Sequence, residues 1–275
     1  MLILPMTQSE LDKLEETLVQ GIRDFMKKNG FSRAHLGLSG GVDSALTAYL
    51  AVQAAGAENV TGISMPSRFS SQGSKDDAAK LAANLRCRYE TIPIEGIYST
   101  YLTALEKVFE NRPFDVAEEN LQARIRGTLL MAYSNKFNSV LLATGNKSEA
   151  AMGYCTLYGD TCGALAPIGN LFKTDVYALC NRINTRSGGA LIIPKEIIDK
   201  SPSAELRPGQ KDEDSLPPYD TLDAILRLRI CENLSPAEIV SKGWDSELVN
   251  RIINTMTRME FKLIQCPPSL PLSLS

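Results

Sequence analysis

Histidine is almost absent from this chain of 275 residues, which contains a single one, His35. The six cysteines are scattered and include no C-x-x-C pair. A zinc site of cysteine and histidine needs several such ligands at characteristic spacings, so we expect no site of this class. Reduced thiols in a cytoplasmic protein are the simplest interpretation, because disulfides are rare in that compartment.

A strong net charge and a long apolar run are also missing. The formal net charge is -3, so no general basic field draws the chain to nucleic acid or to a membrane. No run of about 18 apolar residues could span a bilayer, and the apolar start is too short for a signal peptide. With 44% hydrophobic residues, we expect one globular domain over residues 1–275, located in the cytoplasm, with no nucleic-acid or membrane partner.

Short apolar segments alternate with helical patterns along most of the chain. Strands are predicted at 33–38, 60–65, 89–94, 139–143 and 191–193. Helices are predicted at 45–55, 76–85, 97–110 and 117–136, after a first helix that begins with a capping box at Thr7. Alternation of this kind favours parallel pairing through right-handed crossovers. We therefore predict an α/β fold with a doubly wound parallel sheet of about five strands flanked by helices.

The turn after the first predicted strand reads L-G-L-S-G-G-V-D-S at 36–44. Three interpretations compete: a plain strand-to-helix connection, a nucleophile elbow of the G-x-S-x-G type, and a cradle for phosphate. The elbow needs a histidine base downstream of its serine. It is excluded because His35, which we interpret as structural, lies upstream of Ser39.

Phosphate binding explains this turn better than a plain connection does. A helix N-terminus with free N–H groups, next to small residues and hydroxyls, is an anion site. No lysine follows the glycines, so the turn is not a Walker A loop. Asp43 follows them instead, and a carboxylate beside phosphate suggests polyphosphate bound with Mg²⁺.

The motif S-G-G-V-D-S at 39–44 resembles the SGGxDS motif of N-type ATP pyrophosphatases. Other segments resemble NAD synthetases within that superfamily, and together with the motif they cover nearly the whole chain. These segments are N-L-Q-A-R-I-R at 120–126, T-G-N-K-S-E at 144–149, G-Y-C-T-L-Y-G-D at 153–160, P-I-G-N-L-F-K-T at 167–174 and K-S-P-S-A-E-L at 200–206. The resemblance implies a Rossmann-like fold of the adenine nucleotide alpha hydrolase type.

The resemblance also implies a role for individual residues. The residues expected to bind ATP are Gly37, Leu38, Ser39, Gly40, Gly41, Val42, Asp43, Ser44, Met65, Thr144, Lys173 and Ser203. Asp43 and Glu149 would bind Mg²⁺, and Asp160 and Lys173 would be catalytic. The positions expected to contact deamido-NAD are Arg124, Leu157, Ala164, Phe261 and Lys262. Taken alone, Asp43 and Glu149 are more typical of acids at helix starts than of metal ligands, and Lys173 is typical of a solvated surface.

Three of these positions depart from the pattern of many ammonia-dependent members. Leu157 stands where those members have a lysine, Ala164 where they have an acid, and Phe261 where some have a histidine. The contacts to the acceptor are therefore expected to differ in detail from those members.

The implied reaction is ATP-dependent amidation of deamido-NAD with ammonia, through an acyl adenylate, to give NAD, AMP and pyrophosphate. The alternative is another N-type ATP pyrophosphatase, such as a tRNA-modifying or GMP synthetase-like enzyme. Only about 35 residues precede the motif, too few for a further domain. Ammonia is therefore expected either free or from a separate glutamine amidase. Family members are homodimers, so we expect a dimer, and the loops at 67–74 and 200–219 are expected to act as lids.

Overall fold

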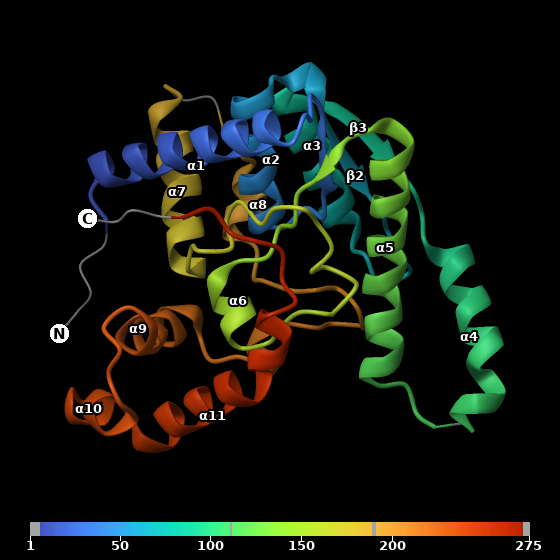
Figure 1. The fold of residues 1–275 in the computed structure, drawn as a ribbon. Coiled ribbons are helices and arrows are strands. Elements are labelled where there is room, and N and C mark those ends of the chain that lie inside the picture. The colour runs from blue at the N-terminus through green and yellow to red at the C-terminus, as the bar shows by residue number, and fades with distance from the viewer. Residues whose placement is uncertain (1–5, 111, 189–190, 272–275) are drawn as a thin grey trace.

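The computed structural model describes residues 6–110, 112–188 and 191–271 (Figure 1). It begins with a long helix, α1 (Gln8–Lys28), whose predicted capping box is present. The Thr7 hydroxyl accepts a bond from the Glu10 backbone N–H at 3.3 Å, and the Glu10 carboxylate accepts one from the Thr7 backbone N–H at 2.7 Å. No helix within the described part of the chain has the length and apolar character needed to cross a bilayer.

Four parallel strands form the sheet, in the order β3-β2-β1-β4. They are β1 (Ala34–Gly37), β2 (Val60–Ser64), β3 (Arg88–Thr91) and β4 (Val140–Leu141). Ala34 pairs with Val60 on one side and with Val140 on the other, so β1 is a central strand. The predicted α/β class with a parallel sheet is confirmed.

Helices cover both faces of the sheet (Figure 1). The helices that connect successive strands are α2 (Val42–Ala55), α3 (Gln72–Leu85), α4 (Glu95–Phe109) and α5 (Val116–Phe137). Val140 and Leu142 pack with α1, α2 and α7 (Lys173–Arg186), whereas Leu141 packs with α4 and α5. Because side chains alternate along a strand, successive residues enter different cores, and the sheet is doubly wound.

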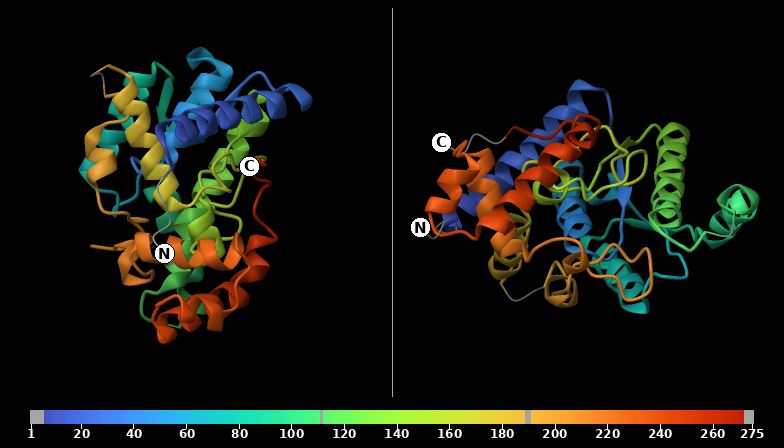
Figure 2. Two further views of the ribbon diagram at one scale, coloured as in Figure 1. Left: turned by 90° about the vertical axis from the view of Figure 1, so that its left-hand side faces the viewer. Right: turned by 90° about the horizontal axis from the view of Figure 1, so that it is seen from below.

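A separate group of helices packs beyond the carboxyl ends of the strands, at the bottom of the left view in Figure 2. It consists of α9 (Tyr219–Ile230), α10 (Pro236–Ser241) and α11 (Ser246–Leu263), which share a core with the short α6 (Lys147–Ala151). The remaining elements are α8 (Lys195–Asp199), η1 (Ala57–Asn59) and η2 (Asp212–Asp214).

The fifth predicted strand, at 191–193, is wrong, because these residues form no strand. Their backbone groups are bound by side chains instead. The Asn84 amide donates to the carbonyls of Leu191 and Ile192, each at 3.0 Å. The Asn184 amide accepts from the Ile193 N–H at 2.9 Å and donates to its carbonyl at 2.7 Å. An apolar run whose backbone is satisfied in this way has no need of a neighbouring strand.

The boundaries of two helices also differ from prediction, in ways that affect the site. α2 begins at Val42, directly after the paired glycines, and not at 45. α3 begins at Gln72, because Ser71 caps it by accepting a bond from the Ser74 N–H at 3.1 Å. The end of the loop predicted at 67–74 is therefore helix.

Candidate active site

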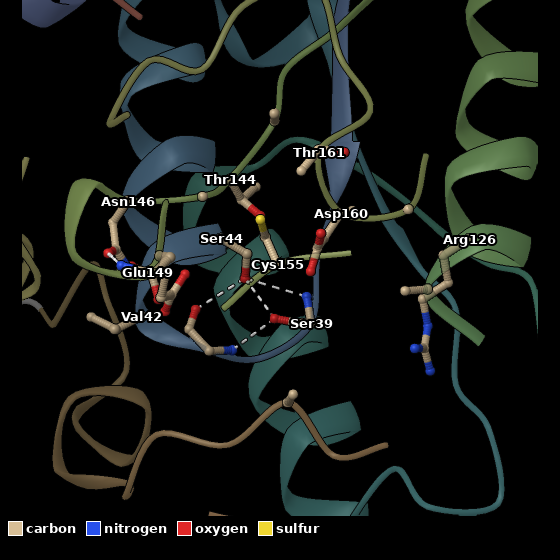
Figure 3. Close-up of a pocket in the computed structure, with 18 of the residues that line it drawn as sticks. Ser39, Val42, Ser44, Arg126, Thr144, Asn146, Glu149, Cys155, Asp160 and Thr161 are labelled. Carbon is tan, nitrogen blue, oxygen red and sulfur yellow. Dashed lines mark hydrogen bonds between the residues drawn. The ribbon is translucent and has the colours of Figure 1, made fainter. Parts of the chain in front are cut away.

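The residues that follow β1 form a tight turn, residues 38–41, called here the glycine turn. Ser39 and Ser44 fix its shape, as the dashed lines in Figure 3 show. Their hydroxyl oxygens are 3.1 Å apart, and the backbone N–H groups of Ser39 and Gly41 donate to Ser44 Oγ and Ser39 Oγ. Gly41 is the N-cap of α2 and has no side-chain cap. The first N–H groups of α2 are thus available to an anion.

Gly40 has no tolerable substitute in this turn. Its φ is +81°, in the region that favours glycine. A Cβ at this position would lie 2.2 Å from the backbone oxygen of Ser74, which belongs to the first turn of α3. The glycine turn therefore sits directly against the start of α3.

Lys173, the first residue of α7, bridges the two predicted metal carboxylates. Its Nζ lies 2.5 Å from Asp43 Oδ2 and 2.9 Å from Glu149 Oε1, and its side chain is only 3% exposed. The Asn146 amide donates to Asp43 Oδ1 at 2.8 Å. Asp43 follows β1 and Glu149 follows β4, so the expected convergence at the carboxyl ends of the strands is confirmed.

Burial and charge shift the pKa values of this group. Burial raises the pKa of Glu149 to about 7, with a contribution from Asp43 and against the influence of Lys173. Burial by itself would lower the pKa of Lys173, but the carboxylates of Asp43 and Glu149 outweigh it and raise that pKa. The lysine consequently stays charged at any physiological pH.

A buried polar network behind Lys173 sets its position. The Lys173 backbone N–H donates to Ser148 Oγ at 2.9 Å, and Ser148 donates to Asp223 Oδ1 at 2.5 Å. Asp223 Oδ2 accepts from the Thr174 N–H at 2.8 Å. Asp223 belongs to α9 and is 1% exposed, so the C-terminal helices hold the starts of α6 and α7 together.

Asp212 adds a further carboxylate beside this group. It accepts bonds from the hydroxyls of Tyr154 at 3.1 Å and Tyr219 at 2.8 Å. The Tyr219 hydroxyl is also 3.5 Å from Glu149 Oε1, and Lys173 Nζ lies 5.2 Å from the centre of the Tyr219 ring. The Tyr219 hydroxyl therefore lies within 3.5 Å of both carboxylates and connects Asp212 with Glu149.

A cavity of about 350 Å³ connects the glycine turn with these groups. The predicted site residues that line it are Gly37, Leu38, Ser39, Gly41, Val42, Asp43, Ser44, Met65, Thr144, Glu149, Asp160, Lys173 and Ser203. Gly40 does not line it and acts through the shape of the turn. The structure thus brings together the whole set predicted to bind ATP and Mg²⁺, although their roles in binding stay predictions.

Asp160 lies on the other side of this cavity from Glu149 (Figure 3). Its carboxylate accepts a bond from the Thr156 N–H at 2.7 Å. The side chain opens into the cavity, but the surrounding protein raises its pKa to about 6, against the opposing influence of that bond and of Lys262. A Cβ on Gly127 of α5 would lie 2.8 Å from the Tyr158 carbonyl. The absence of a side chain at Gly127 therefore allows the backbone of the segment that carries Asp160 to pack directly against α5.

The residues predicted to contact deamido-NAD lie outside the cavity lining. Arg124 is exposed and its Nε donates to the Leu157 carbonyl at 3.3 Å. Lys262 Nζ donates to the carbonyls of Gly153 and Cys155, both at 2.8 Å. Phe261 is 53% exposed beside it on α11. Ala164 is exposed and its N–H donates to the Leu141 carbonyl at 2.9 Å.

Arg126 is a cavity residue that the sequence prediction missed. It lines the cavity, and its Nε donates to the Met65 carbonyl at 3.0 Å (Figure 3). Burial lowers its pKa to about 10, while the carboxylates of Glu205 and Asp160 oppose that effect. Residues two apart on a helix point about 200° away from each other, so only one arginine of A-R-x-R could face the cavity. The helical spacing of the two arginines is the feature of the sequence that distinguishes Arg126 from Arg124.

The single histidine has a structural environment, as predicted. His35 is fully buried in β1, with Nδ1 2.9 Å from Ser139 Oγ and Nε2 2.9 Å from the Leu130 carbonyl. Both ring nitrogens are occupied, and burial lowers its pKa. It is therefore unable to serve as a base at the glycine turn.

Comparisons with known proteins agree with the geometry. A model of the family described as NAD synthase matches residues 14–266. A glutamine-dependent NAD(+) synthetase from Synechocystis sp. is 52% identical over 267 residues, which is 97% of this chain and 47% of that protein. The chain spans about half the length of the curated relatives it matches.

Solved structures give the same result. An NH3-dependent NAD synthetase from Campylobacter jejuni has a TM-score of 0.74 at 31% identity, over 92% of this chain and 96% of that one. A glutamine-dependent NAD+ synthetase from Acinetobacter baumannii, in complex with ADP, has a TM-score of 0.69 at 42% identity, over 93% of this chain and 46% of that one.

Proposed function

Because this chain belongs to the NAD synthase family, we propose that it forms NAD from deamido-NAD, ATP and ammonia and releases AMP and pyrophosphate. The observation that supports this most strongly is the single cavity that unites the glycine turn, the Lys173 ion pairs and Asp160. It provides an anion cradle and a fixed positive charge on one side, and a titratable carboxylate on the other.

In the first step, the nicotinate carboxylate of deamido-NAD attacks the α-phosphorus of ATP. A P–O bond forms as the bond to pyrophosphate breaks, which gives an acyl adenylate. The N–H groups at the start of α2 and the Lys173 ammonium would stabilise the negative charge that develops on the leaving group. The ADP complex of the Acinetobacter baumannii relative supports an adenine nucleotide as the ligand of this fold.

Mg²⁺ fits the donor set at this position. Asp43 and Glu149 offer hard carboxylate oxygens, and Mg²⁺ is commonly held by one or two carboxylates together with substrate phosphates. Among the described residues, no group of three or more His, Cys, Asp or Glu side chains is arranged to hold a metal alone. The ion would thus arrive with ATP, and it would offset phosphate charge.

In the second step, ammonia attacks the acyl carbon, and the bond to AMP breaks. The attacking nitrogen must lose a proton to become the amide, and ammonium must lose one to become a nucleophile. Asp160, with a pKa of about 6, is ionised at neutral pH and could accept that proton. Its position across the cavity from the glycine turn supports this role.

The source of ammonia is part of the proposal. Relatives with similar sequences are named glutamine-dependent, whereas the Campylobacter jejuni protein is named NH3-dependent. Ammonia attacks the acyl adenylate in either case, and the difference lies in how it is delivered. We propose that the module described here uses ammonia, either free or supplied by a glutamine amidase.

A homodimer is also proposed, with the deamido-NAD site completed near the partner. Exposed apolar side chains gather around the predicted acceptor residues: Tyr158 is 68% exposed, Phe261 53% and Ile264 79%. Exposed apolar groups so close together are typical of an interface.

All six cysteines are free thiols, which suits a reducing compartment such as the cytoplasm.

An assay of pyrophosphate release tests the proposed function. We expect release that requires ATP, Mg²⁺ and deamido-NAD together, and NAD formation that also requires ammonium. Xanthosine monophosphate and tRNA, the acceptors of the alternative pyrophosphatases, should give no release. Release with either of them but not with deamido-NAD would replace NAD synthesis with that activity.

A further inference from the structure

One carboxylate, that of Glu205, attaches residues 200–210 to the start of α3. It accepts bonds from the Ser71 N–H at 3.2 Å, from Ser71 Oγ at 2.8 Å and from Ser74 Oγ at 2.6 Å. Lys200 Nζ lies 3.9 Å from the same carboxylate. Ser71 is the N-cap of α3, so the negative charge sits at the positive end of the helix dipole.

The backbone of this segment is folded so that Glu205 lies in the left-handed region, with a φ of +49°. Residues other than glycine adopt this conformation at a cost in free energy. Ser203 and Gln210 maintain it: Ser203 Oγ donates to the Gln210 carbonyl at 2.6 Å and accepts from the Glu205 N–H at 3.1 Å. Gln210 Oε1 also accepts from the Leu206 N–H at 2.8 Å. A strained conformation that is supported by so many bonds points to a function.

The start of α3 also touches the glycine turn. The Ser74 backbone oxygen is the atom that a Cβ on Gly40 would meet at 2.2 Å, while Ser74 Oγ binds Glu205. Ser74, Ser203 and Glu205 all line the cavity. One turn of helix therefore connects residues 200–210 to the site where the phosphates are proposed to bind.

We propose that Glu205 is a positioning residue that keeps residues 200–210 seated over the cavity while the acyl adenylate exists. This inference rests on the proposed function, since it concerns the fate of that intermediate. Water that reached the acyl carbon would break the bond to AMP and return deamido-NAD. Each such event would consume one ATP and release pyrophosphate without forming NAD.

The test is the ratio of NAD formed to pyrophosphate released. We expect Glu205→Gln, which keeps the size of the side chain and removes its charge, to lower this ratio about three-fold or more. Glu213→Gln is the matched control, because Glu213 is exposed and lies in the neighbouring η2. That variant should keep the ratio of the parent chain.

Comparison of Glu205→Gly with Glu205→Gln separates the carboxylate from the backbone strain, because glutamine keeps the strain and glycine relieves it. Glycine relieves the positive φ but also loses the bonds of the carboxylate, so the unfolding temperature should fall less than in Glu205→Gln while the ratio falls in both variants. A residue with a merely structural role would change stability and leave the ratio unaltered. An unchanged ratio in both Glu205 variants would overturn the proposal.

A second readout needs no activity. Trypsin should cleave at Lys200 and Lys211 faster in Glu205→Gln than in the parent chain and in Glu213→Gln. Equal cleavage of all three chains would also overturn the proposal. If the parent chain forms no NAD, the proposed function has failed, but this cleavage test still decides whether Glu205 holds the segment.

Discussion

Replacement of Lys173 by methionine removes the only cation that contacts Asp43 and Glu149 within the described residues. The lysine side chain is 3% exposed and the carboxylates are 17% and 18% exposed. Loss of one partner of a buried ion pair costs about 3–5 kcal/mol. Glu149 can take up a proton once Lys173 no longer lowers its pKa, so we expect the lower end, about 3 kcal/mol. This corresponds to a fall of roughly 6–12 °C in unfolding temperature.

Pyrophosphate release should fall more sharply than stability. Removal of one preorganised charge at a reacting centre typically reduces the rate by about 10²–10³-fold. The assay is pyrophosphate release at 25 °C, together with thermal unfolding of the same sample. Lys147→Met is the control, since Lys147 lies 5.1 Å from the Phe172 ring and its ammonium contacts neither carboxylate.

A second substitution separates stability from catalysis. Glu149→Gln in the Lys173→Met background removes the need for Glu149 to take up a proton, so it should recover part of the lost stability, and more of it as the pH rises. It should not recover pyrophosphate release, because the positive charge remains absent. A Lys173→Met chain that unfolds at the temperature of the parent and still releases pyrophosphate normally would refute this account of the site.

Three further predictions concern the metal carboxylate, the proton acceptor and the nitrogen donor. Asp43→Asn should stay folded and lose pyrophosphate release, measured beside its circular dichroism spectrum; normal release would exclude the metal role. At constant free ammonia, NAD formation should fall as pH drops below about 7, first as Glu149 and then, at about 6, as Asp160 becomes protonated, whereas Asp160→Asn should be slow at every pH. A raised carboxyl pKa stabilises the fold at low pH and this contribution is lost as pH rises through about 6, so unfolding at this group would not explain the acid loss. The 275-residue chain should not use glutamine in place of ammonium, because the NAD synthase family match takes up residues 14–266 of it and leaves no room there for an amidase domain; sustained turnover with ammonium-free glutamine would contradict this.

The strands and the glycine turn could be predicted because their signals are local. Apolar runs of strand length, each followed by turn residues, located β1, β2, β3 and β4 to within a few residues. The rule that parallel strands end at one edge then brought Asp43 and Glu149 together, although 106 residues separate them in the numbering of the chain. Resemblance to a family was needed for Lys173, since nothing in its local sequence distinguishes it from a surface lysine.

The failures have identifiable physical causes. The run at 191–193 has the composition of a strand, but Asn84 and Asn184 bind its backbone groups, and neither amide could be paired with it from sequence. α3 begins four residues before the predicted start at 76, because the Ser71 side chain caps a first turn that contains Gln72 and Gly73, which are typical of loops. The motif predicts Arg124 as a binding residue, but the rotation of α5 turns Arg126, and not Arg124, toward the cavity.

The buried polar groups behind Lys173 could not be predicted from the sequence for a different reason. Asp223 lies 50 residues beyond Lys173 and fixes its helix through Ser148 and Thr174. An aspartate inside an amphipathic helix is ordinarily read as a solvent-facing residue, yet this one is 1% exposed. Only the packing of α9 against α6 and α7 gives it a partner, and that packing depends on the whole C-terminal group of helices. Among the C-terminal helices, α9 therefore supports the candidate site without lining the cavity, whereas α11 reaches the cavity with Leu263. A substitution that loosens α9 should disturb Lys173 before it disturbs the sheet, because the contacts of Asp223 are made to the starts of α6 and α7, the two helices that carry Glu149 and Lys173.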